Sequence, residues 1–482
     1  MRMSRGGPAP GRVVNERRER VDVVIVGGGI SGLCAAYWLA QQGFGVKVLE
    51  REAEVGGTMK SVHEQGFLSE TGPNSALETT PLCRELVAEC GISDEFLYAN
   101  PVGKKRYILR DGRMHALPLD PAAFLMTKLF SARGKFRLLK EPFVGRGTGE
   151  ESIAEFVSRR VGQEFLDYAI DPFVAGVFAG RPESLSVQAS FPKLYALEKK
   201  YGGLVRGMIR GRRERKQRAE KAKDRAESFS FAGGMQVLPR AIATKLGHAV
   251  LTNARVEAIR RTDPSSFSVT YTHGDIPGTI DCRSVVVSAP AYGAADLLQP
   301  LSGEAASVLR SITYSPVTSM FLGFKKEEVG HPLDGFGVLI PTKERRDILG
   351  CLWSSSLFPY RAPEGMVALT AFVGGARQPE LTQLPENKLC DLVLNELKKI
   401  MQVSGKLVYL RVTTWKQAIP QYELGYLRKI EALDRFEESH PGLFVCGNYR
   451  GGISVGDCVK SASEVSQRAA QHLQTHASPA RG

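Results

Sequence analysis

The sequence predicts an α/β (α+β) protein with a Rossmann-like parallel sheet, a second mixed sheet and a helical insertion. Three observations predict this fold class. A buried strand, a glycine-rich turn and a helix occupy residues 21–39; helical patterns with basic and apolar faces run from about residue 118 to 225; and strand patterns return after residue 228. Because strands that alternate with helices form parallel sheets, the first pattern predicts a layered α/β unit.

The opening segment has the spacing of a dinucleotide-binding turn. Residues 21–26 are an almost continuous apolar run, as in a buried parallel strand. Gly27, Gly29 and Gly32 follow as G-x-G-x-x-G, and residues 33–39 begin an apolar helix. These glycines allow a tight turn, close approach of the backbone to a pyrophosphate, and close packing of helix on strand. The N-terminal amides of the helix would face the phosphates.

The next segments narrow the identity of the nucleotide. The second strand, "GVKVLE", ends in Glu50, at the spacing at which an acid accepts the ribose hydroxyls. This acid argues against a 2′-phosphate and leaves FAD and NAD. Gly56-Gly57, the turn "ETGPNS" at residues 70–75 and a second glycine loop before a helix at 447–464 suit a cofactor that spans distant segments. They favour FAD over NAD.

The remaining elements follow in chain order. "TTPLCRELVAECGI" predicts a helix, and "KKRYILRDGRMHALP" predicts a hairpin with "RDG" as its turn. After the helical insertion, "VLTNARVEAIRR", "FSVTYTH" and "SVVVSAPA" predict short strands, and residues 316–375 predict a separate sheet. A helix at "NKLCDLVLNELKKIM", the strand "LVYLRVTTW" and a final strand, loop and helix complete the chain.

Composition describes an ordinary globular chain of two or three domains, with 482 residues, 43% hydrophobic and 24% charged. The eight cysteines form no C-x-x-C pair, which indicates reduced thiols, and the histidines form no cluster, so we expect no metal site. The first 20 residues hold six arginines and two glutamates without an apolar core. We expect a disordered extension rather than a secretory signal, with an organellar presequence as the less favoured alternative.

The net charge of +13 is concentrated in two places, residues 1–20 and residues 206–227. The second run holds ten basic and four acidic residues. A solvated charged helix or loop and contact with anionic lipid both explain it. Nucleic acid is not an expected partner, because no aromatic platform or binding motif accompanies the charge.

Several of these motifs resemble the FAD-containing amine oxidase and protoporphyrinogen oxidase superfamily: "GGGISG" with Glu50, Gly56-Gly57, "SFAGGMQVL", "NARVEAI" and "CGNYRGGISVGD". The resemblance implies FAD as the cofactor. It assigns the pyrophosphate to Gly27, Gly28, Gly29, Ile30, Ser31 and Gly32, the adenosine ribose to Glu50, and the adenine to the backbone of Val256, and it adds Arg51 as a further cofactor contact. Around the rest of the cofactor, chiefly the isoalloxazine, it places Gly56, Gly57, Thr58, Thr71, Gly72, Pro73, Asn74, Trp415, Gly447, Ile453, Ser454 and Val455. Core packing is the alternative for Trp415.

The middle of the chain is similar to oxygen-dependent protoporphyrinogen oxidases, in "DPFVAGVFAGRPESLSVQASFPKLYALEKKYGGLVRG", "GFGVLIPTKE" and "ALTAFVGGARQPEL". This similarity implies that Arg106 pairs with a propionate, that Leu339, Leu352 and Phe372 sandwich pyrrole rings, and that the carbonyl of Gly176 lies near the reacting methylene. Without the resemblance, Arg106 is a surface residue, the three apolar residues are strand core and Gly176 ends a helix. Arg181 and Tyr426 depart from the family pattern.

The resemblance also implies a domain division. A p-hydroxybenzoate hydroxylase-like FAD-binding domain comprises residues 21–100, 229–315 and 440–482; a substrate domain comprises 101–117 and 316–439; a membrane-association domain comprises 118–228. The expected partners are protoporphyrinogen IX, dioxygen and the surface of a membrane, with a homodimer and product transfer to ferrochelatase or magnesium chelatase as further candidates. We expect a cytoplasmic protein peripheral to the inner membrane, or an organellar-membrane protein in a eukaryote.

The expected reaction is oxidation of protoporphyrinogen IX to protoporphyrin IX, with hydrogen peroxide as by-product. Two rival functions stay open: oxidation of coproporphyrinogen III, which Lys104 and Lys105 beside Arg106 would favour, and a flavin-binding porphyrin carrier without catalysis. Phytoene desaturase or amine oxidase activity is less favoured.

Overall fold

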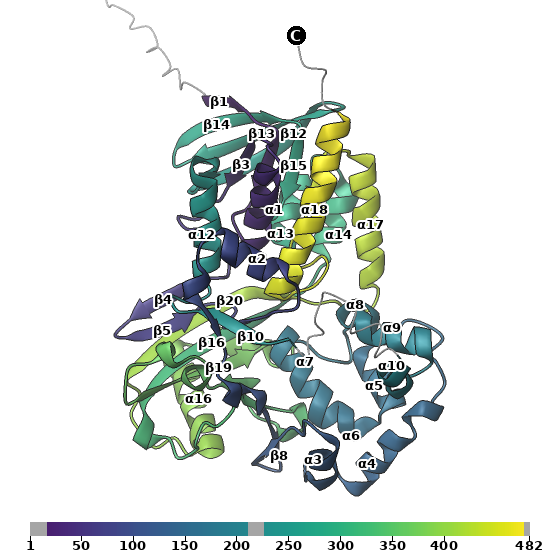
Figure 1. Ribbon diagram of the computed structural model, residues 1–482, viewed down its shortest axis with the longest axis vertical. Coiled ribbons are helices and arrows are strands. Elements are labelled where there is room, and N and C mark those ends of the chain that lie inside the picture. Colours follow the sequence, from purple (N-terminus) through teal and green to yellow (C-terminus); the bar gives the residue numbers. More distant parts are fainter. Residues whose placement is uncertain (1–16, 211–225, 477–482) are drawn as a thin grey trace, which may run out of the picture.

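The computed structural model describes residues 17–210 and 226–476, and it confirms the α/β fold class (Figure 1). A five-stranded sheet is parallel throughout. In spatial order its strands are β11 (Val250–Leu251), β3 (Val46–Leu49), β2 (Val23–Val26), β15 (Ser284–Val287) and β21 (Leu443–Val445). Strands from both ends and the middle of the chain therefore lie side by side in one sheet.

Helices cover both faces of this sheet. Val23 and Ile25 face a core with α1 (Ile30–Gln41), α2 (Leu82–Glu89), α12 (Val237–Leu246) and α18 (Val455–Thr475). Val24 and Val26 face α13 (Ala291–Leu298), α14 (Gly303–Arg310) and α17 (Tyr426–Ser439). Because successive strand residues point to opposite faces, a strand buried on both sides is apolar at every position, as the "VVIV" run is.

The predicted disordered extension is wrong at its last four residues. Residues 17–20 form strand β1 (Arg17–Arg20), which pairs in parallel with Gly278–Asp281 of β14 (Ile276–Cys282). The same sheet contains β13 (Ser266–His273) and β12 (Ala254–Asp263). The edge of β14 supplies the backbone partners that a charged segment without apolar residues lacks locally. Residues 1–16 lie outside the described residues.

The separate sheet expected in the second half has seven strands (Figure 1). In spatial order these are β20 (Tyr409–Pro420), β16 (Tyr314–Lys325), β19 (Met366–Gly374), β18 (Gly350–Leu352), β17 (Gly337–Leu339), β8 (Tyr107–Arg110) and β9 (Arg113–Ala116). The predicted hairpin is confirmed as β8–β9, with Asp111 and Gly112 at the turn. Helix α16 (Glu386–Met401) packs on the face that holds Val338, Cys351 and Ala371.

Shorter strands connect the two large sheets. Strands β4 (Ser61–Glu64) and β5 (Phe67–Glu70) form a hairpin, and β10 (Ser228–Phe231) pairs with β6 (Ala76–Leu77) and β7 (Phe96–Tyr98). The stacked rings of Phe67 and Tyr409 lie 5.0 Å apart and pack β5 against β20. The turn after β5 is thereby held beside the seven-stranded sheet.

The chain between residues 121 and 210 folds into helices. These are α3 (Pro121–Met126), α4 (Ala132–Leu139), η3 (Glu141–Phe143), α5 (Ile153–Arg160), α6 (Gln163–Phe165), η4 (Leu166–Ile170), α7 (Asp171–Phe178), α8 (Val187–Ser190), α9 (Pro192–Tyr201) and α10 (Leu204–Arg210). Most of the basic run predicted at residues 206–227 lies in 211–225, outside the described residues. None of the described helices is both long and apolar enough to cross a bilayer.

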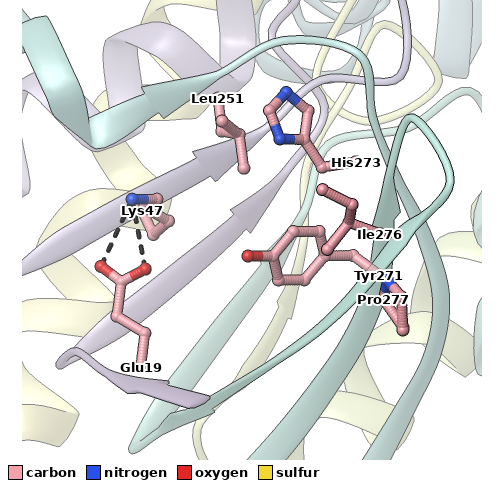
Figure 2. A pocket seen from close by; sticks show the side chains of 7 residues that line it. All are labelled: Glu19, Lys47, Leu251, Tyr271, His273, Ile276 and Pro277. Carbon is pink, nitrogen blue, oxygen red and sulfur yellow. Dashed lines mark hydrogen bonds and ion pairs between the residues drawn. The ribbon is translucent and has the colours of Figure 1, made fainter. Parts of the chain in front are cut away.

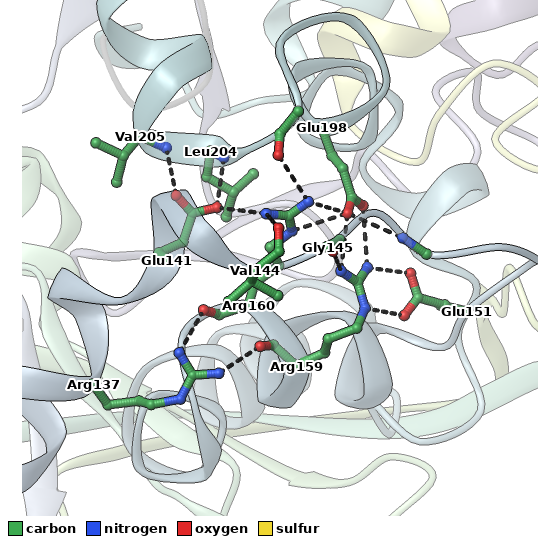
Figure 3. Close-up of polar contacts among 12 residues, drawn as sticks. Arg137, Glu141, Val144, Gly145, Glu151, Arg159, Arg160, Glu198, Leu204 and Val205 are labelled. Carbon is green, nitrogen blue, oxygen red and sulfur yellow. Dashed lines mark hydrogen bonds and ion pairs between the residues drawn. The ribbon is translucent and has the colours of Figure 1, made fainter.

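A buried ionic cluster joins these helices (Figure 3). The Arg160 side chain is fully buried and pairs with Glu141 and Glu198, while Arg159 pairs with Glu151 and Glu198. Glu141 also accepts hydrogen bonds from the backbone N–H groups of residues 204 and 205, at 2.7 and 3.1 Å. The cluster therefore ties α10 to η3 and α5, in place of a larger apolar core.

Acidification should loosen this cluster. Burial would raise the pKa of Glu198, but hydrogen bonds from Arg159 and Arg160 outweigh it and hold the pKa below the ordinary value. Because the pKa is lowered on folding, the stabilisation is present above the unfolded-state pKa and is lost as the pH falls through the folded one. We expect Glu198→Gln to cost about 2–3 kcal/mol at pH 7 and to flatten the pH dependence below about pH 4.5.

Hydrogen exchange of the amides in α5, α9 and α10 at graded pH measures this effect. The exposed Glu183, which lies 3.9 Å from Arg181, offers a matched Glu183→Gln control. Equal pH dependence of exchange in Glu198→Gln and the wild type would contradict the assignment.

Candidate active site

The glycine turn after β2 has the form that a bound pyrophosphate requires. Gly27 has φ +106°, and a methyl group on Gly32 would overlap the Gly27 carbonyl oxygen. Gly29 is different, because a methyl group there would have no atom within 4 Å. Gly32 therefore allows close packing of α1 on the turn, whereas Gly29 leaves open space above the backbone. Gly28, Ile30 and Ser31 are buried around them.

Glu50 closes this turn from the end of β3. It is 6% exposed, and its Oε2 accepts a hydrogen bond from the Gly28 N–H at 2.6 Å. Its backbone carbonyl accepts one from Ala254, which starts the strand that carries Val256. The pairing of β12 with β13 is irregular at Val256. Arg51 is exposed and pairs with Glu52, so it lies beside this site without entering its buried part.

The segments 56–58, 71–74 and Trp415 meet next to the glycine turn. The Gly56 N–H donates to the Gly28 carbonyl at 2.8 Å, and a methyl group on Gly72 would overlap the Thr58 carbonyl oxygen. The Trp415 Nε1–H donates to the Thr71 carbonyl at 2.6 Å. Trp415 is half-buried in this contact, so it links the seven-stranded sheet to the turn that includes Pro73 and Asn74.

The C-terminal glycine loop lies between β21 and α18. Ser454 caps α18 by accepting from the Asp457 N–H, and Asp457 caps back in return. Tyr422 holds the loop: its hydroxyl donates to the Asn448 carbonyl at 2.6 Å and accepts from the Gly452 N–H at 3.1 Å. Gly447 and Val455 are buried, and Ile453 is half-buried against two cores.

The family departure Tyr426 has a structural part in the same loop. Its hydroxyl donates to the Tyr449 carbonyl at 2.6 Å, and its ring stacks on Tyr422 with centroids 4.3 Å apart. The other departure, Arg181, is exposed beside Glu183. Neither residue therefore lies among the predicted substrate contacts.

These features fit a bound dinucleotide. Within the described residues, the buried Ser288 hydroxyl oxygen has no hydrogen-bond partner, and it lies 3.1 Å from where a methyl on Gly32 would be. An unpaired buried hydroxyl is costly unless a ligand or water bonds to it. The open face of Gly29 leaves room for such a ligand beside the glycine turn.

The predicted substrate residues lie on one face of the seven-stranded sheet. Leu339 pairs with Gly350 and Gly350 with Phe372, and paired residues in a sheet point to the same side. Leu352 lies two residues beyond Gly350, so it shares that side. Phe372 also pairs with Ser319, and Ser319 pairs with Thr413 on the next strand. Trp415 lies two residues beyond Thr413, so its side chain points to the same side of the sheet. This face is opposite the one that α16 covers.

Arg106 directly precedes β8, and its side chain points to the same face of the sheet. Its carbonyl accepts from the Leu117 N–H, which continues the β8–β9 pairing by one residue. Tyr107 pairs with Val338 and Ile108 with Leu339, so by the same register Arg106 lies beside Gly337. Gly337 in turn pairs with Leu352, so Arg106 and Leu352 point to the same side of the sheet. The sheet register thus brings together predicted substrate residues as far apart in sequence as Arg106 and Phe372, which are 266 positions apart.

The charge of Arg106 is not compensated by a carboxylate. No ion pair joins its guanidinium to an acid of residues 17–210 or 226–476, and the group stacks over the Phe336 ring with its Cζ 5.1 Å from the centroid. Burial lowers the pKa of Arg106. Its neighbour Lys105 pairs with Asp334 at 2.5 Å instead. A partly desolvated guanidinium without a partner favours an anionic ligand.

Helix α7 covers this face of the sheet. A methyl group on Gly176 would lie 2.6 Å from the Leu339 Cδ2, and Ala175 and Ala179 pack against Phe372. Gly176 therefore allows the helix to approach β17 closely. Leu339 and Phe372 are partly buried in these contacts. They therefore pack against neighbouring residues of the protein in addition to their predicted contact with the substrate.

The sequence did not single out two buried arginines near the site. Arg361 contacts Glu70, Ser230 and Asn74, and Arg377 contacts Asp171 and Ile340. The only sequence signal was their position in family-like segments, "FPYRAPEG" and "FVGGARQPEL". Their partners are distant in sequence, so spacing alone could not reveal them.

A small crevice lies beside the edge strand β11 and its neighbour β3 in the nucleotide-binding sheet (Figure 2). It measures about 140 Å³ and is lined by Glu19, Lys47, Leu251, Tyr271, His273, Ile276 and Pro277. Lys47 pairs with Glu19 at 3.2 Å, which fastens β1 to β3. None of the predicted site residues lines it, so we do not assign it to the cofactor or the substrate.

Comparison with known proteins agrees with this geometry. Residues 30–470 match the model of the family described as flavin containing amine oxidoreductase. The chain is 34% identical to protoporphyrinogen oxidase 2, chloroplastic/mitochondrial, of Arabidopsis thaliana, over 97% of this chain and 98% of that protein. It is 30% identical to coproporphyrinogen III oxidase of Bacillus subtilis (strain 168), over 91% and 95%.

The fold is also similar to a crystal structure from Exiguobacterium sp. 255-15, a candidate protoporphyrinogen oxidase. The TM-score is 0.78 with 22% identity, over 94% of this chain and 99% of that one. The family match begins at the first residue of α1 and ends within α18, so it includes Glu50, the turn at 71–74 and the sheet face beside them. The chain therefore belongs to the flavin-containing amine oxidoreductase family and is an FAD-dependent oxidoreductase.

Proposed function

We propose that this chain oxidises protoporphyrinogen IX to protoporphyrin IX, with dioxygen as the electron acceptor and hydrogen peroxide as by-product. The observation that carries the proposal is Arg106, which has no acidic partner among the described residues and lies on the sheet face that presents Leu339, Leu352 and Phe372. A porphyrinogen has this pattern, a broad apolar ring with carboxylates at one edge. The names of the curated relatives, protoporphyrinogen and coproporphyrinogen oxidases, support the same substrate class.

In the proposed complex, Arg106 binds a propionate, because a guanidinium offers a planar pair of donors to a carboxylate and stays charged. Leu339, Leu352 and Phe372 contact the pyrrole rings from one face of the sheet. Helix α7, which packs against Leu339, would bring the Gly176 backbone near the reacting methylene. Residues 27–32 and 71–74 would hold FAD, which would supply the hydride acceptor.

No strong side-chain base is needed at this site. Loss of a methylene hydride leaves a cation spread over the neighbouring pyrroles, and a pyrrole N–H then gives up its proton. The chain's own residues position the ring and exclude water. Repeated two-electron steps would lead to the aromatic porphyrin.

Anaerobic mixing with protoporphyrinogen IX tests the proposal. We expect the flavin absorbance to bleach, and admission of air to restore it with release of peroxide and red porphyrin fluorescence. A porphyrin carrier without catalysis would leave the flavin oxidised and release no peroxide. That result would overturn the proposed reaction while leaving the fold and the cofactor site unaffected.

Coproporphyrinogen III remains the second candidate substrate, supported by the Bacillus subtilis relative. Its four carboxylates would require more free cations than the described residues offer beside Arg106. Of the three neighbouring cations, Lys105 pairs with Asp334, Lys104 is exposed at the end of η2 (Pro101–Lys104), and Arg106 alone faces the apolar row. Parallel turnover assays decide the matter, and a higher kcat/KM for coproporphyrinogen would reverse the assignment.

Replacing Arg106 with alanine should weaken substrate binding more than cofactor binding. A charge-assisted hydrogen bond contributes about 1.5–3 kcal/mol, so KM should rise by about 10- to 100-fold. The FAD content should remain that of the wild type, since Arg106 contacts no residue of the cradle. Steady-state kinetics and the flavin-to-protein ratio measure the two effects. Lys104→Ala is the matched control, and equal loss of FAD and substrate binding would exclude the propionate role.

We propose, in addition, that the helical region binds a membrane surface. Large apolar side chains there are exposed: Leu119, Leu125, Met126, Phe136, Leu139, Phe143, Met208 and Ile209. The elements that carry most of them are in contact, since Lys135 of α4 caps the end of α3, and η3 packs against both α4 and α10. Exposed apolar side chains among lysines and arginines are typical of interfacial binding.

Double replacement of Leu139 and Phe143 by serine should abolish most binding to vesicles. Both side chains are largely exposed, at 69% and 84%, so their loss removes lipid contact without opening the core. Co-sedimentation with vesicles that contain anionic lipid, at low and high salt, measures the effect. Tyr360→Ser, at 64% exposure outside the helical region, is the control. Wild-type protein that ignores anionic vesicles at low salt would contradict the proposal.

Peripheral membrane location, homodimer formation and product transfer to a chelatase stay predictions.

A further inference from the structure

A short loop after β19 fastens helix α7 at both ends. At the N-terminal end, the Arg377 Nη2 lies 2.9 Å from the Asp171 Oδ2. At the C-terminal end, the Ala376 N–H donates to the Ala179 carbonyl at 2.7 Å. We call residues 374–377 the α7 clasp. Since the clasp spans the helix, α7 cannot shift relative to β19 without breaking one of these contacts.

The two glycines of the clasp allow this close approach. Gly374 and Gly375 have φ values of +94° and +66°, which L side chains rarely adopt. A methyl group on Gly375 would lie 2.7 Å from the Ala179 carbonyl oxygen, too close for any other residue. The two glycines of "VGG" are therefore needed because the loop lies so close to the end of α7, and not only because the chain turns there.

Arg377 also fixes the strand opposite α7. Its Nη1–H donates to the Ile340 carbonyl at 2.6 Å, and Ile340 directly follows Leu339. Gly176 of α7 faces Leu339, and Phe372 lies two residues before the clasp. One guanidinium thus connects the three chain segments that present Gly176, Leu339 and Phe372.

The ion pair between Arg377 and Asp171 is buried, and further hydrogen bonds hold Asp171 in place. The Arg377 and Asp171 side chains are each 10% exposed, and Asp171 also accepts from the Thr342 N–H at 2.7 Å and its hydroxyl at 2.9 Å. One turn earlier, Asp167 pairs with Lys343 at 2.5 Å. The π-helical turn η4 that contains Asp167 leads directly into α7, and such turns are frequent at functional sites.

We propose that Arg377 is a positioning residue that fixes α7 against β17 and β19, and so sets where Gly176, Leu339 and Phe372 meet the macrocycle. The inference rests on the proposed porphyrinogen oxidation. Arg377 acts through α7 and β17, because Asp171 begins the helix that carries Gly176 and Ile340 directly follows Leu339, the last residue of β17.

A double-mutant cycle between Gly176 and Arg377 tests this role. In the wild-type background, Gly176→Ala pushes a methyl group toward Leu339, and KM for protoporphyrinogen should rise by about 100-fold. Arg377→Lys loses the paired contacts and loosens the clasp, so the same methyl group should raise KM by about tenfold or less in that background. FAD content should stay equal in all four proteins, because the clasp contacts no residue of the cradle.

Arg346→Lys is the matched control. Arg346 is partly buried and lies 3.7 Å from Glu396 of α16, on the other face of the sheet. Its cycle with Gly176→Ala should be additive. If the Arg377→Lys protein does not fold, Thr342→Val replaces it, since this change removes only the hydroxyl contact with Asp171.

The outcomes separate the two proposals. An active wild type with an additive Arg377 cycle overturns the positioning role and leaves the proposed function standing. A wild type that oxidises neither porphyrinogen overturns the proposed function. Hydrogen exchange of α7, measured without substrate, should be faster in Arg377→Lys than in Arg346→Lys, and equal rates would overturn the clasp itself.

Discussion

Replacing Arg361 with methionine is expected to lower the free energy of unfolding by about 3–5 kcal/mol and to reduce FAD retention. Arg361 is 3% exposed, and its guanidinium lies 2.5 Å from the Glu70 Oε1. Glu70 is itself buried, so methionine would leave an uncompensated carboxylate in the interior. Removing one partner of a buried ion pair costs far more than removing both, because the remaining charge stays desolvated.

The effect on FAD follows from the second contact of Arg361. Its Nη2–H donates to the Ser230 hydroxyl at 2.7 Å and to the Asn74 carbonyl at 3.3 Å. Asn74 ends the turn that carries Thr71 and Gly72, next to Trp415. Loss of Arg361 therefore frees the turn that is predicted to border the isoalloxazine.

Urea unfolding and the flavin-to-protein ratio measure these effects, with Arg361→Met/Glu70→Gln as the control. The double variant leaves no orphaned charge and should recover most of the stability. It should not recover FAD retention, because the Asn74 contact stays lost. If the double variant is as unstable as the single one, the unpaired Glu70 carboxylate is not the cause of the lost stability.

Local patterns predicted the strand, glycine turn and helix at residues 23–41 correctly. The spacing of Gly27, Gly29 and Gly32 and the acid at Glu50 are set within one strand–turn–helix–strand unit, so neighbours in sequence are neighbours in space. The same holds for the β8–β9 hairpin, whose turn residues specify its geometry. The burial of Glu50 against Gly28 agrees with the interpretation of that acid.

Contacts between distant segments were not predictable in this way. Arg361 and Glu70 are 291 residues apart, and nothing in their spacing relates them. Residues 17–20 contain three arginines, so their strand could not be predicted without the edge of β14. The common face of Arg106, Leu352 and Trp415 depends on the register of several strands, which only the folded sheet defines.

The substrate face and the cofactor turn depend on each other through these long-range contacts. Trp415 and Arg361 both belong to the half of the chain that builds the seven-stranded sheet, and both hold the turn at 71–74. A shift of the sheet would therefore move the turn with it. This coupling explains why buried polar groups, which are costly to desolvate, lie at the junction of the two sheets.

Alanine at Gly29 and alanine at Gly32 are expected to abolish FAD binding for different reasons. At Gly29, φ is −71° and no atom lies within 4 Å of the added methyl group, so the apoprotein should be as stable as the wild type. The methyl group would instead occupy the space that a pyrophosphate needs above the backbone. At Gly32, the methyl group would overlap the Gly27 carbonyl oxygen and contact Ile25. Packing of α1 on β2 should then fail, at a cost of about 1–3 kcal/mol to the apoprotein.

The two variants distinguish a glycine that leaves room for the ligand, Gly29, from a glycine that allows the helix to pack, Gly32. Thermal unfolding of the FAD-free proteins should place Gly29→Ala with the wild type and Gly32→Ala several degrees lower. Titration with FAD should then show saturation for the wild type alone. Retention of FAD by Gly29→Ala would mean that the cofactor does not cross this turn, because Gly29 is where the backbone leaves room for it. The assignment of residues 27–32 to the pyrophosphate would then be wrong, although the fold would be unchanged.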